Sequence, residues 1–200
     1  MTQCLLPCRS QYAFRSKMYS VPEVNSMPDD RFVWVFGNVI ELCKDAAVWV
    51  KKKRPFNRLA DLCTEFHKYL DNLIFVLEKL VILKSHPDLA GRLAVLGELT
   101  KESTEEQKSA GLDKINAEQK SIINACNERY KLKFGFPFII CARENKVQSI
   151  IDGLNSRILN SRDQEIETGI NEVKKILYPK SESHDLTELG YIEDIFKTNV

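Results

Sequence analysis

The segment from Phe134 to Ala142, with the sequence FGFPFIICA, constrains the fold more than any other part of the chain. It is almost wholly apolar, contains a glycine and a proline, and lacks the spacing of an amphipathic helix. Elsewhere the apolar residues recur at helical spacing, most clearly from Arg58 to Lys84. Because no alternating strand pattern of useful length is present, we expect an all-α fold with one buried extended segment at 134–142.

The helical patterns predict a single bundle of about seven to nine helices. A helix start is indicated at Ser26, where proline and acidic residues follow a serine. The apolar stripe from Arg58 to Lys84 predicts two helices with a bend near Asp71 and Asn72. We expect a disordered or targeting-like extension at 1–18, a helical domain at 19–179 and a polar tail at 180–200.

Charge and composition exclude several classes of partner. The formal net charge is +1, so no general attraction to nucleic acid or to an anionic membrane is expected. No apolar run reaches the roughly 18 residues of a membrane helix. The three histidines lie far apart and predict no metal site. The six cysteines lack C-x-x-C spacing, which is typical of reduced cysteines in an intracellular protein; they are Cys4, Cys8, Cys43, Cys63, Cys126 and Cys141.

The segment KSHPDLAGR, from Lys84 to Arg92, is the first candidate for chemistry. Proline and aspartate suit the first turn of a helix, so His86 can be simply a residue near a helix cap. The alternative is functional, because a helix start offers N–H groups to an anion and an imidazole beside it can move a proton near neutral pH.

The segment from Leu99 to Gln107, LTKESTEEQ, is the second candidate. Ser103 and Glu106 have the spacing of a capping box, which alone would explain the glutamate. In the functional interpretation, Ser103, Glu106 and Gln107 present a hydroxyl, a carboxylate and an amide to a polar heterocycle. The 134–142 segment has two interpretations as well, since it can pack in the core without any role in binding or can offer backbone groups to a planar ligand.

Together these segments resemble the OHCU decarboxylase family, the cofactor-independent ureidoimidazoline decarboxylases of urate breakdown. The shared motifs are His-Pro-Asp-Leu-Ala at His86 to Ala90, Leu-Thr-x-x-Ser-x-x-Glu-Gln at Leu99 to Gln107, and Phe-Gly-Phe-Pro-Phe-x-Ile-x-Ala at Phe134 to Ala142. Weaker matches are Phe36 to Val39, Arg54 to Phe56 and Leu59 to Leu62. The resemblance covers residues 21 to 177.

The resemblance implies an all-helical, homodimeric enzyme without cofactors that converts 2-oxo-4-hydroxy-4-carboxy-5-ureidoimidazoline to (S)-allantoin with release of carbon dioxide. It implies that His86 transfers the proton and that Glu106 is its acidic companion. The residues it implies for substrate binding are Pro87, Ser103, Thr104, Glu105, Glu106, Gln107, Phe138, Ile139, Ile140, Cys141 and Ala142.

The chain departs from the family pattern after its last helix, where relatives commonly carry Leu-Arg-Leu and this chain has Tyr178-Pro179-Lys180. Lys180 is therefore a candidate partner of the substrate carboxylate, and Arg157 is another, with Arg162 and Arg143 as further cations nearby in sequence. The C-terminus lacks the Ser-Lys-Leu type of peroxisomal signal, and we expect a peroxisomal or cytoplasmic location. The rival hypothesis is a non-catalytic helical interaction protein that keeps the motifs for folding alone.

Overall fold

The structure is a computed structural model that describes residues 19–89, 99, 103–104, 107–108, 110–177 and 191–192. The all-α fold class is confirmed, with α-helices that dominate the described residues. The helices are α1 (Val21–Ser26), α2 (Asp29–Phe36), α3 (Lys44–Val50), α4 (Leu59–Asp71), α5 (Val76–Ser85), α8 (Ala117–Phe134), α9 (Val147–Arg157) and α10 (Arg162–Ile176). No helix in these ranges is long and apolar enough to cross a membrane.

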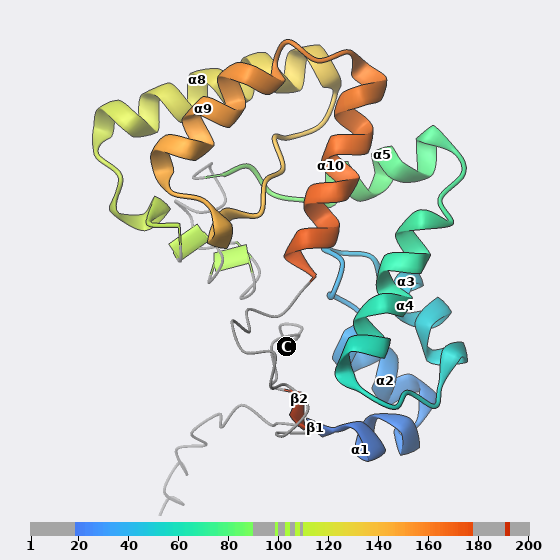
Figure 1. Ribbon diagram of the computed structural model, residues 1–200. Helices are drawn as coiled ribbons and strands as arrows, with labels where there is room; N and C mark the ends of the chain where they lie inside the picture. Colours follow the sequence, from blue (N-terminus) through green and yellow to red (C-terminus); the bar gives the residue numbers. More distant parts are fainter. Residues whose placement is uncertain are drawn as a thin grey trace, which may run out of the picture.

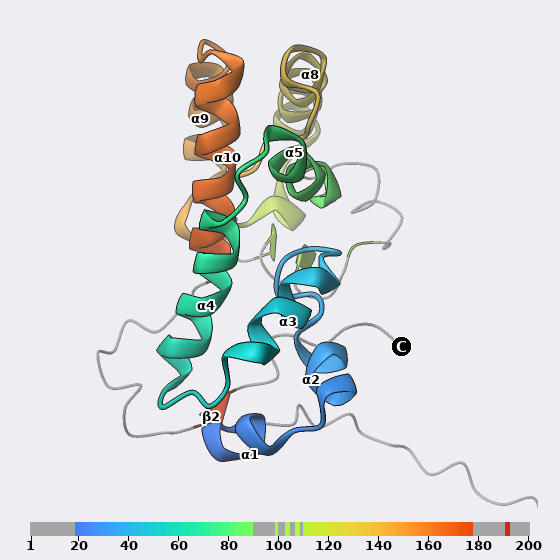
Figure 2. The same cartoon turned by 90° about the vertical axis from the view of Figure 1, so that its right-hand side faces the viewer.

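The helix α10 runs through the centre of the molecule and joins its two groups of helices (Figure 1). It contacts α8 on one side and both α4 and α5 on the other. The helices α8 and α9 lie side by side at one end, and α1 to α4 gather at the other end (Figures 1 and 2). The predicted bend in the apolar stripe is confirmed, because α4 ends at Asp71 and α5 starts at Val76.

Local sequence signals fix the ends of the helices that surround the crossing segment. The side chain of Asn116 accepts a hydrogen bond from the backbone N–H of Gln119 at 2.8 Å and caps the start of α8. Gly135 ends that helix in the left-handed conformation, at φ 82°, which favours glycine. Ser161 caps α10 through the backbone N–H of Gln164.

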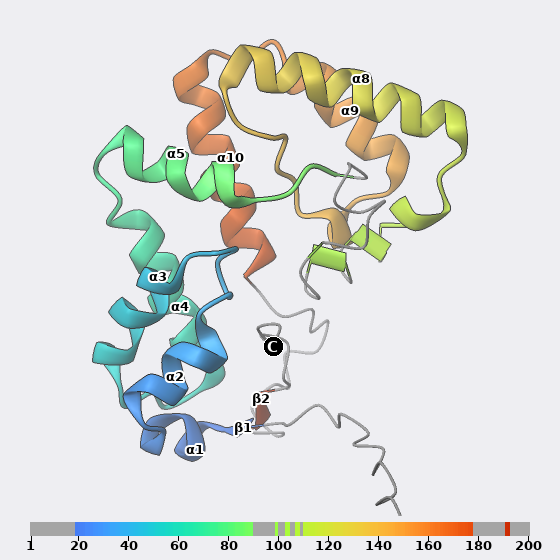
Figure 3. The same cartoon turned by 180° about the vertical axis from the view of Figure 1, so that it is seen from behind.

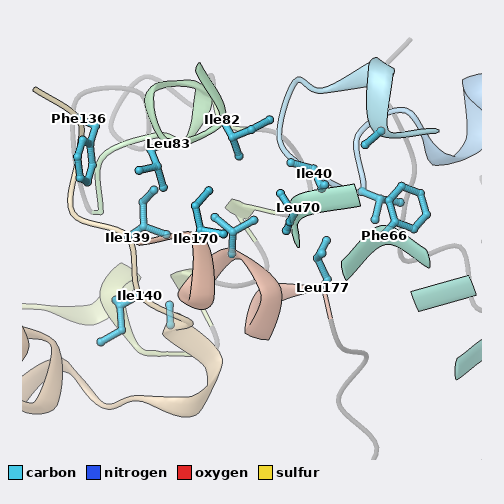
Figure 4. Close-up of a cluster of buried hydrophobic side chains, with 14 of the residues drawn as sticks. Ile40, Phe66, Leu70, Ile82, Leu83, Phe136, Ile139, Ile140, Ile170 and Leu177 are labelled. Atoms are coloured by element: carbon cyan, nitrogen blue, oxygen red, sulfur yellow. The ribbon is translucent and has the colours of Figure 1, made fainter. Parts of the chain in front are cut away.

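Close packing between α5 and α10 fixes the position of the C-terminal end of α5. A Cβ atom at Gly169 of α10 would lie 2.8 Å from the Cδ2 atom of Leu83, so a larger residue at this position would require the Leu83 side chain to move. Figure 4 shows Leu83 beside Ile139 and Ile170, in one apolar cluster that joins the two helices to the crossing segment. The last turn of α5 is therefore held against the centre of the molecule.

The crossing segment links α8 to α9 and passes through the interior (Figure 3). The prediction of a buried segment is confirmed, since Phe136 and the residues from Phe138 to Ala142 are all buried. Its predicted bounds are too wide, because Phe134 is still part of α8 and Ala142 starts a 3-10 turn, Ala142–Glu144. The helical hydrogen bonds of α8 continue up to the glycine, which explains the later start.

A short antiparallel strand pair was not expected from the sequence. Strand β1 (Tyr19–Ser20) pairs with β2 (Tyr191–Ile192), with Tyr19 opposite Ile192. Part of the segment 180–200 therefore lies against the start of the helical domain. The division into an extension, a domain and a tail stays a prediction.

Candidate active site

A pocket lies where the end of α5, the 103–107 region and the crossing segment meet. Its cavity volume is about 30 Å³, and its mouth is open to solvent. Its lining residues are His86, Pro87, Leu89, Ser103, Gln107, Phe138, Ile139, Ile140, Ala142 and Ile176. All three segments that the sequence singled out thus contribute to one pocket, although up to about fifty residues separate them along the chain.

His86 forms the C-terminal cap of α5, and its imidazole is partly buried in the pocket. This differs from the helix start predicted from Pro87 and Asp88; whether a helix begins after Leu89 lies outside the described residues. The Nδ1 atom lies 2.9 Å from the carbonyl oxygen of Ile82. Since a carbonyl only accepts, Nδ1 carries the proton and neutral His86 has its lone pair on Nε2.

Burial lowers the pKa of His86 to about 4, from an ordinary value of 6.5, while the hydrogen bond to Ile82 acts in the opposite direction. The imidazole is therefore neutral at physiological pH. It begins as a proton acceptor, and a bound anion beside it would favour its protonated form.

Helix α8 anchors the segment that follows His86. The ammonium group of Lys131 binds the carboxylate of Asp88 at 2.7 Å. The side-chain amide of Asn127 donates to the carbonyl oxygen of Leu89 at 3.2 Å. Asp88 of the shared motif is therefore occupied by an ion pair with α8, and its role in the structure is to hold the backbone beside His86.

Ser103 lies in helical conformation and donates its hydroxyl to the carboxylate of Glu41 at 3.0 Å. Glu41 lies between α2 and α3, and its carbonyl oxygen also accepts the hydroxyl of Ser85 at 2.7 Å. Glu41 therefore connects the residue before His86 with the Ser103 side of the pocket. Gln107 is buried and approaches the carbonyl oxygen of Asp88 at 3.4 Å.

Arg157, a candidate partner of the substrate carboxylate, binds other groups of the protein. Its guanidinium donates to the carboxylate of Glu165 through Nε at 2.9 Å and to the carbonyl oxygen of Ile139 through Nη1 at 2.8 Å. It also lies over the ring of Phe138, 4.4 Å from the centroid. Arg157 does not line the pocket, so the geometry gives the predicted carboxylate contact no support.

Several other predicted residues lie elsewhere. The backbone N–H of Cys141 donates to the carboxylate of Glu172 at 2.8 Å, away from the pocket lining. Thr104 is partly buried but does not line the pocket. The predictions for Glu105, Glu106 and Lys180 fall outside the described residues.

Sequence reasoning missed Glu41, and it missed Leu89 and Ile176 as lining residues. Glu41 follows an apolar pair, Val39 and Ile40, without a turn or charge pattern of its own. Only the convergence of three distant segments in space reveals it. Among the described residues, no group of three or more histidine, cysteine, aspartate or glutamate side chains is placed to share a metal ion.

Comparison with known proteins identifies one family. The family model described as OHCU decarboxylase matches residues 25–178. A Xenopus laevis protein named 2-oxo-4-hydroxy-4-carboxy-5-ureidoimidazoline decarboxylase is 41% identical over 157 residues, which cover 78% of this chain and 88% of that protein. The protein of the same name from Amia calva is 43% identical over 154 residues, covering 77% and 87%.

Two solved structures share the fold. One, a crystal structure of (S)-allantoin synthase, superposes with a TM-score of 0.63 at 19% identity, over 80% of this chain and 51% of that one. The other, a crystal structure of OHCU decarboxylase in the presence of (S)-allantoin, superposes with a TM-score of 0.57 at 22% identity, over 76% of this chain and 93% of that one. At these identities the likeness establishes the helical architecture alone.

Proposed function

This chain belongs to the OHCU decarboxylase family, and from that premise we propose that it decarboxylates 2-oxo-4-hydroxy-4-carboxy-5-ureidoimidazoline to (S)-allantoin in urate degradation. The observation that carries the proposal is the pocket in which His86, Ser103 and Gln107 meet the crossing segment. The enzyme is a carboxy-lyase. Its proposed substrate is a small anion with a ureido group, in which one tetrahedral ring carbon carries both the carboxylate and the hydroxyl.

The reaction requires the protein to orient the substrate and to transfer protons. Loss of carbon dioxide leaves an electron pair that moves into the ring towards a nitrogen, which takes up a proton from solvent water, so no external electron sink is required. The substrate hydroxyl must then lose its proton while the neighbouring ring carbon gains one. Because its Nδ1 is held by Ile82, His86 performs both transfers through Nε2.

Delivery of the proton from one side explains a single enantiomer. The crossing segment lines the same pocket as His86 and contributes the apolar side chains of Phe138 and Ile140 to its wall. A ligand held in one orientation against this wall exposes one face to the imidazole. Ser103 and Gln107 supply polar contacts, and we propose Glu106 as the acidic companion of His86 and Lys180 as the candidate partner of the carboxylate.

The experiment that tests the function generates the unstable substrate from urate with urate oxidase and hydroxyisourate hydrolase. The full chain is then added, and circular dichroism follows the formation of optically active allantoin. We expect a rapid signal of the (S) enantiomer. Slow formation of racemic allantoin, as without enzyme, would favour the rival hypothesis of a non-catalytic helical interaction protein.

We also propose that the protein is a homodimer, as the resemblance implies. Helix α5 supports this proposal, because it exposes large apolar side chains such as Leu77 (75%) and Val81 (68%) one turn apart.

Sedimentation equilibrium of the wild type should give twice the chain mass. The double variant Leu77→Lys, Val81→Lys should sediment as a monomer, whereas Leu132→Lys on α8, exposed by 86%, should stay dimeric. A monomeric wild type would refute the dimer.

For the location we propose the peroxisome or the cytoplasm. The resemblance supports this location, because the enzymes of urate breakdown act in succession. The substrate proposed for this chain is unstable, so the enzyme should lie in the compartment where that substrate is formed. Imaging of the full chain with a fluorescent protein at either end, beside a peroxisomal marker, tests it. A signal confined to another compartment in both fusions would contradict it.

A further inference from the structure

Two consecutive peptide groups in the crossing segment are held by charged side chains from different helices. The carbonyl oxygen of Ile139 accepts a hydrogen bond from the guanidinium of Arg157 on α9 at 2.8 Å. The N–H of Cys141 donates to the carboxylate of Glu172 on α10 at 2.8 Å. Both peptide groups flank Ile140, a lining residue of the pocket.

Because a peptide group is planar, these two contacts also fix the directions of the N–H and the carbonyl of Ile140. In a trans peptide the carbonyl and the N–H point in opposite directions across one plane, and the only cis peptide among the described residues is Arg54–Pro55. The N–H of Ile140 therefore points away from Arg157, and the carbonyl of Ile140 points away from Glu172. In Figure 4 the side chains of Ile139 and Ile140 leave the segment on opposite sides, as in an extended strand.

These two groups of Ile140 make no hydrogen bond with any described residue. An N–H and a carbonyl on the same residue of an extended segment form a donor and acceptor pair, which matches the N–H and carbonyl of a ureido or ring amide group. The N–H and carbonyl of Ile140 thus form a donor and acceptor pair at the pocket wall, and the contacts with Arg157 and Glu172 fix its orientation.

We propose that Glu172 and Arg157 are positioning residues that aim the N–H and carbonyl of Ile140 at the ureido or ring amide of the substrate. This inference rests on the proposed function for its ligand. Neither side chain touches the substrate. They act through the peptide groups on either side of Ile140, and they set substrate affinity more than proton transfer.

A buried polar cluster behind the wall supports this role. Glu165 is fully buried and accepts hydrogen bonds from Arg157, from the hydroxyl of Tyr130, and from the amide of Asn160 at 2.7 Å. Burial and the bond to Glu165 raise the pKa of Tyr130 above its ordinary range, so its hydroxyl stays a donor. Such a fully satisfied cluster holds the Arg157 guanidinium in one orientation.

The test uses three variants of the full chain: Glu172→Leu, Glu172→Gln and Lys175→Met. Leucine removes the acceptor of the Cys141 N–H, whereas the glutamine oxygen still accepts it. The methionine variant is the matched control, because it removes the ammonium group that pairs with Glu172 at 2.6 Å and leaves the acceptor of the Cys141 N–H in place. Two quantities are measured, the KM for substrate generated from urate and the hydrogen exchange rate of the Cys141 amide.

We expect Glu172→Leu to raise KM about tenfold, the size of one hydrogen bond in binding, with kcat changed less and with faster exchange at Cys141. Glu172→Gln and Lys175→Met should stay within about twofold of the wild type in both quantities. Unchanged KM and exchange in a folded Glu172→Leu would overturn the proposal. An equal loss in Glu172→Gln would also overturn it, and that variant decides the question if Glu172→Leu does not fold.

The exchange measurement separates this inference from the proposed function. If the wild type formed no (S)-allantoin, the function would fail while the exchange rates still reported whether Glu172 holds the Cys141 amide. If the wild type is active and Glu172→Leu matches it in both quantities, the positioning role alone fails.

Discussion

The Nδ1 atom of His86 lies 2.9 Å from the carbonyl oxygen of Ile82, one helical turn earlier in α5. The last carbonyl groups of a helix lack partners within the helix, and the imidazole satisfies one of them. The same contact assigns the tautomer and fixes the ring at the pocket. A common helix-end interaction thereby leaves the lone pair of the neutral ring on Nε2.

The lowered pKa of His86 predicts a pH dependence of stability. The unfolded chain binds a proton at this site below about pH 6.5, whereas the folded chain does so only below about pH 4. The contribution of His86 to the free energy of unfolding is therefore complete above pH 6.5. It is lost as the pH falls through this window, by up to about 3 kcal/mol.

Urea unfolding at pH 6.5 and at pH 4.5 measures this loss. The variant His86→Asn has no titrating group at the site, so its stability should fall less between these two values than that of the wild type. Equal losses in the two proteins would show that the pKa of His86 is not depressed in the folded state.

Ser103 and Glu41 should behave as one unit. Glu41→Ala removes the acceptor of the Ser103 hydroxyl and should lower kcat/KM about tenfold, the size of a charge-assisted hydrogen bond. The double variant Glu41→Ala, Ser103→Ala should lose little more than either single variant. Steady-state kinetics of the four proteins measures the coupling, and fully additive losses would contradict a shared role.

The ion pair between Arg157 and Glu165 predicts a strong effect on stability. Arg157→Met leaves the fully buried Glu165 without its cation and should lower the free energy of unfolding by about 3–5 kcal/mol. Adding Glu165→Leu should recover much of this loss, because no buried charge is then left alone. Thermal or urea unfolding provides the measurement, and a double variant less stable than Arg157→Met would contradict this explanation.

The helical architecture was predictable because helical periodicity and capping residues are local signals. The bend after Asp71 and the burial of the crossing segment were both predicted and are confirmed. The position of His86 was not. Pro87 and Asp88 suggest a helix start, yet the preceding helix α5 continues to Ser85 and places His86 at its end.

The partners of the site residues were less predictable, since they depend on contacts between distant segments. Arg157 carries no sequence signal that distinguishes a buried partner of Glu165 from a ligand for a substrate carboxylate. Glu41 contacts Ser103 across 62 positions. The resemblance named most of the residues that line the pocket but missed Leu89 and Ile176, and only the packed structure showed which side chains hold the lining residues in place.

The central claim is that His86 moves the proton in this pocket, and one comparison tests it most directly. His67 is the matched control, because its Nε2 also binds a backbone carbonyl, that of Lys174 at 3.0 Å, but it does not line the pocket. Circular dichroism measures the rate of (S)-allantoin formation by the wild type, His86→Asn and His67→Asn, with folding checked in each. We expect His86→Asn to lose about two to four powers of ten and His67→Asn to retain activity. A folded His86→Asn as active as the wild type would contradict the account.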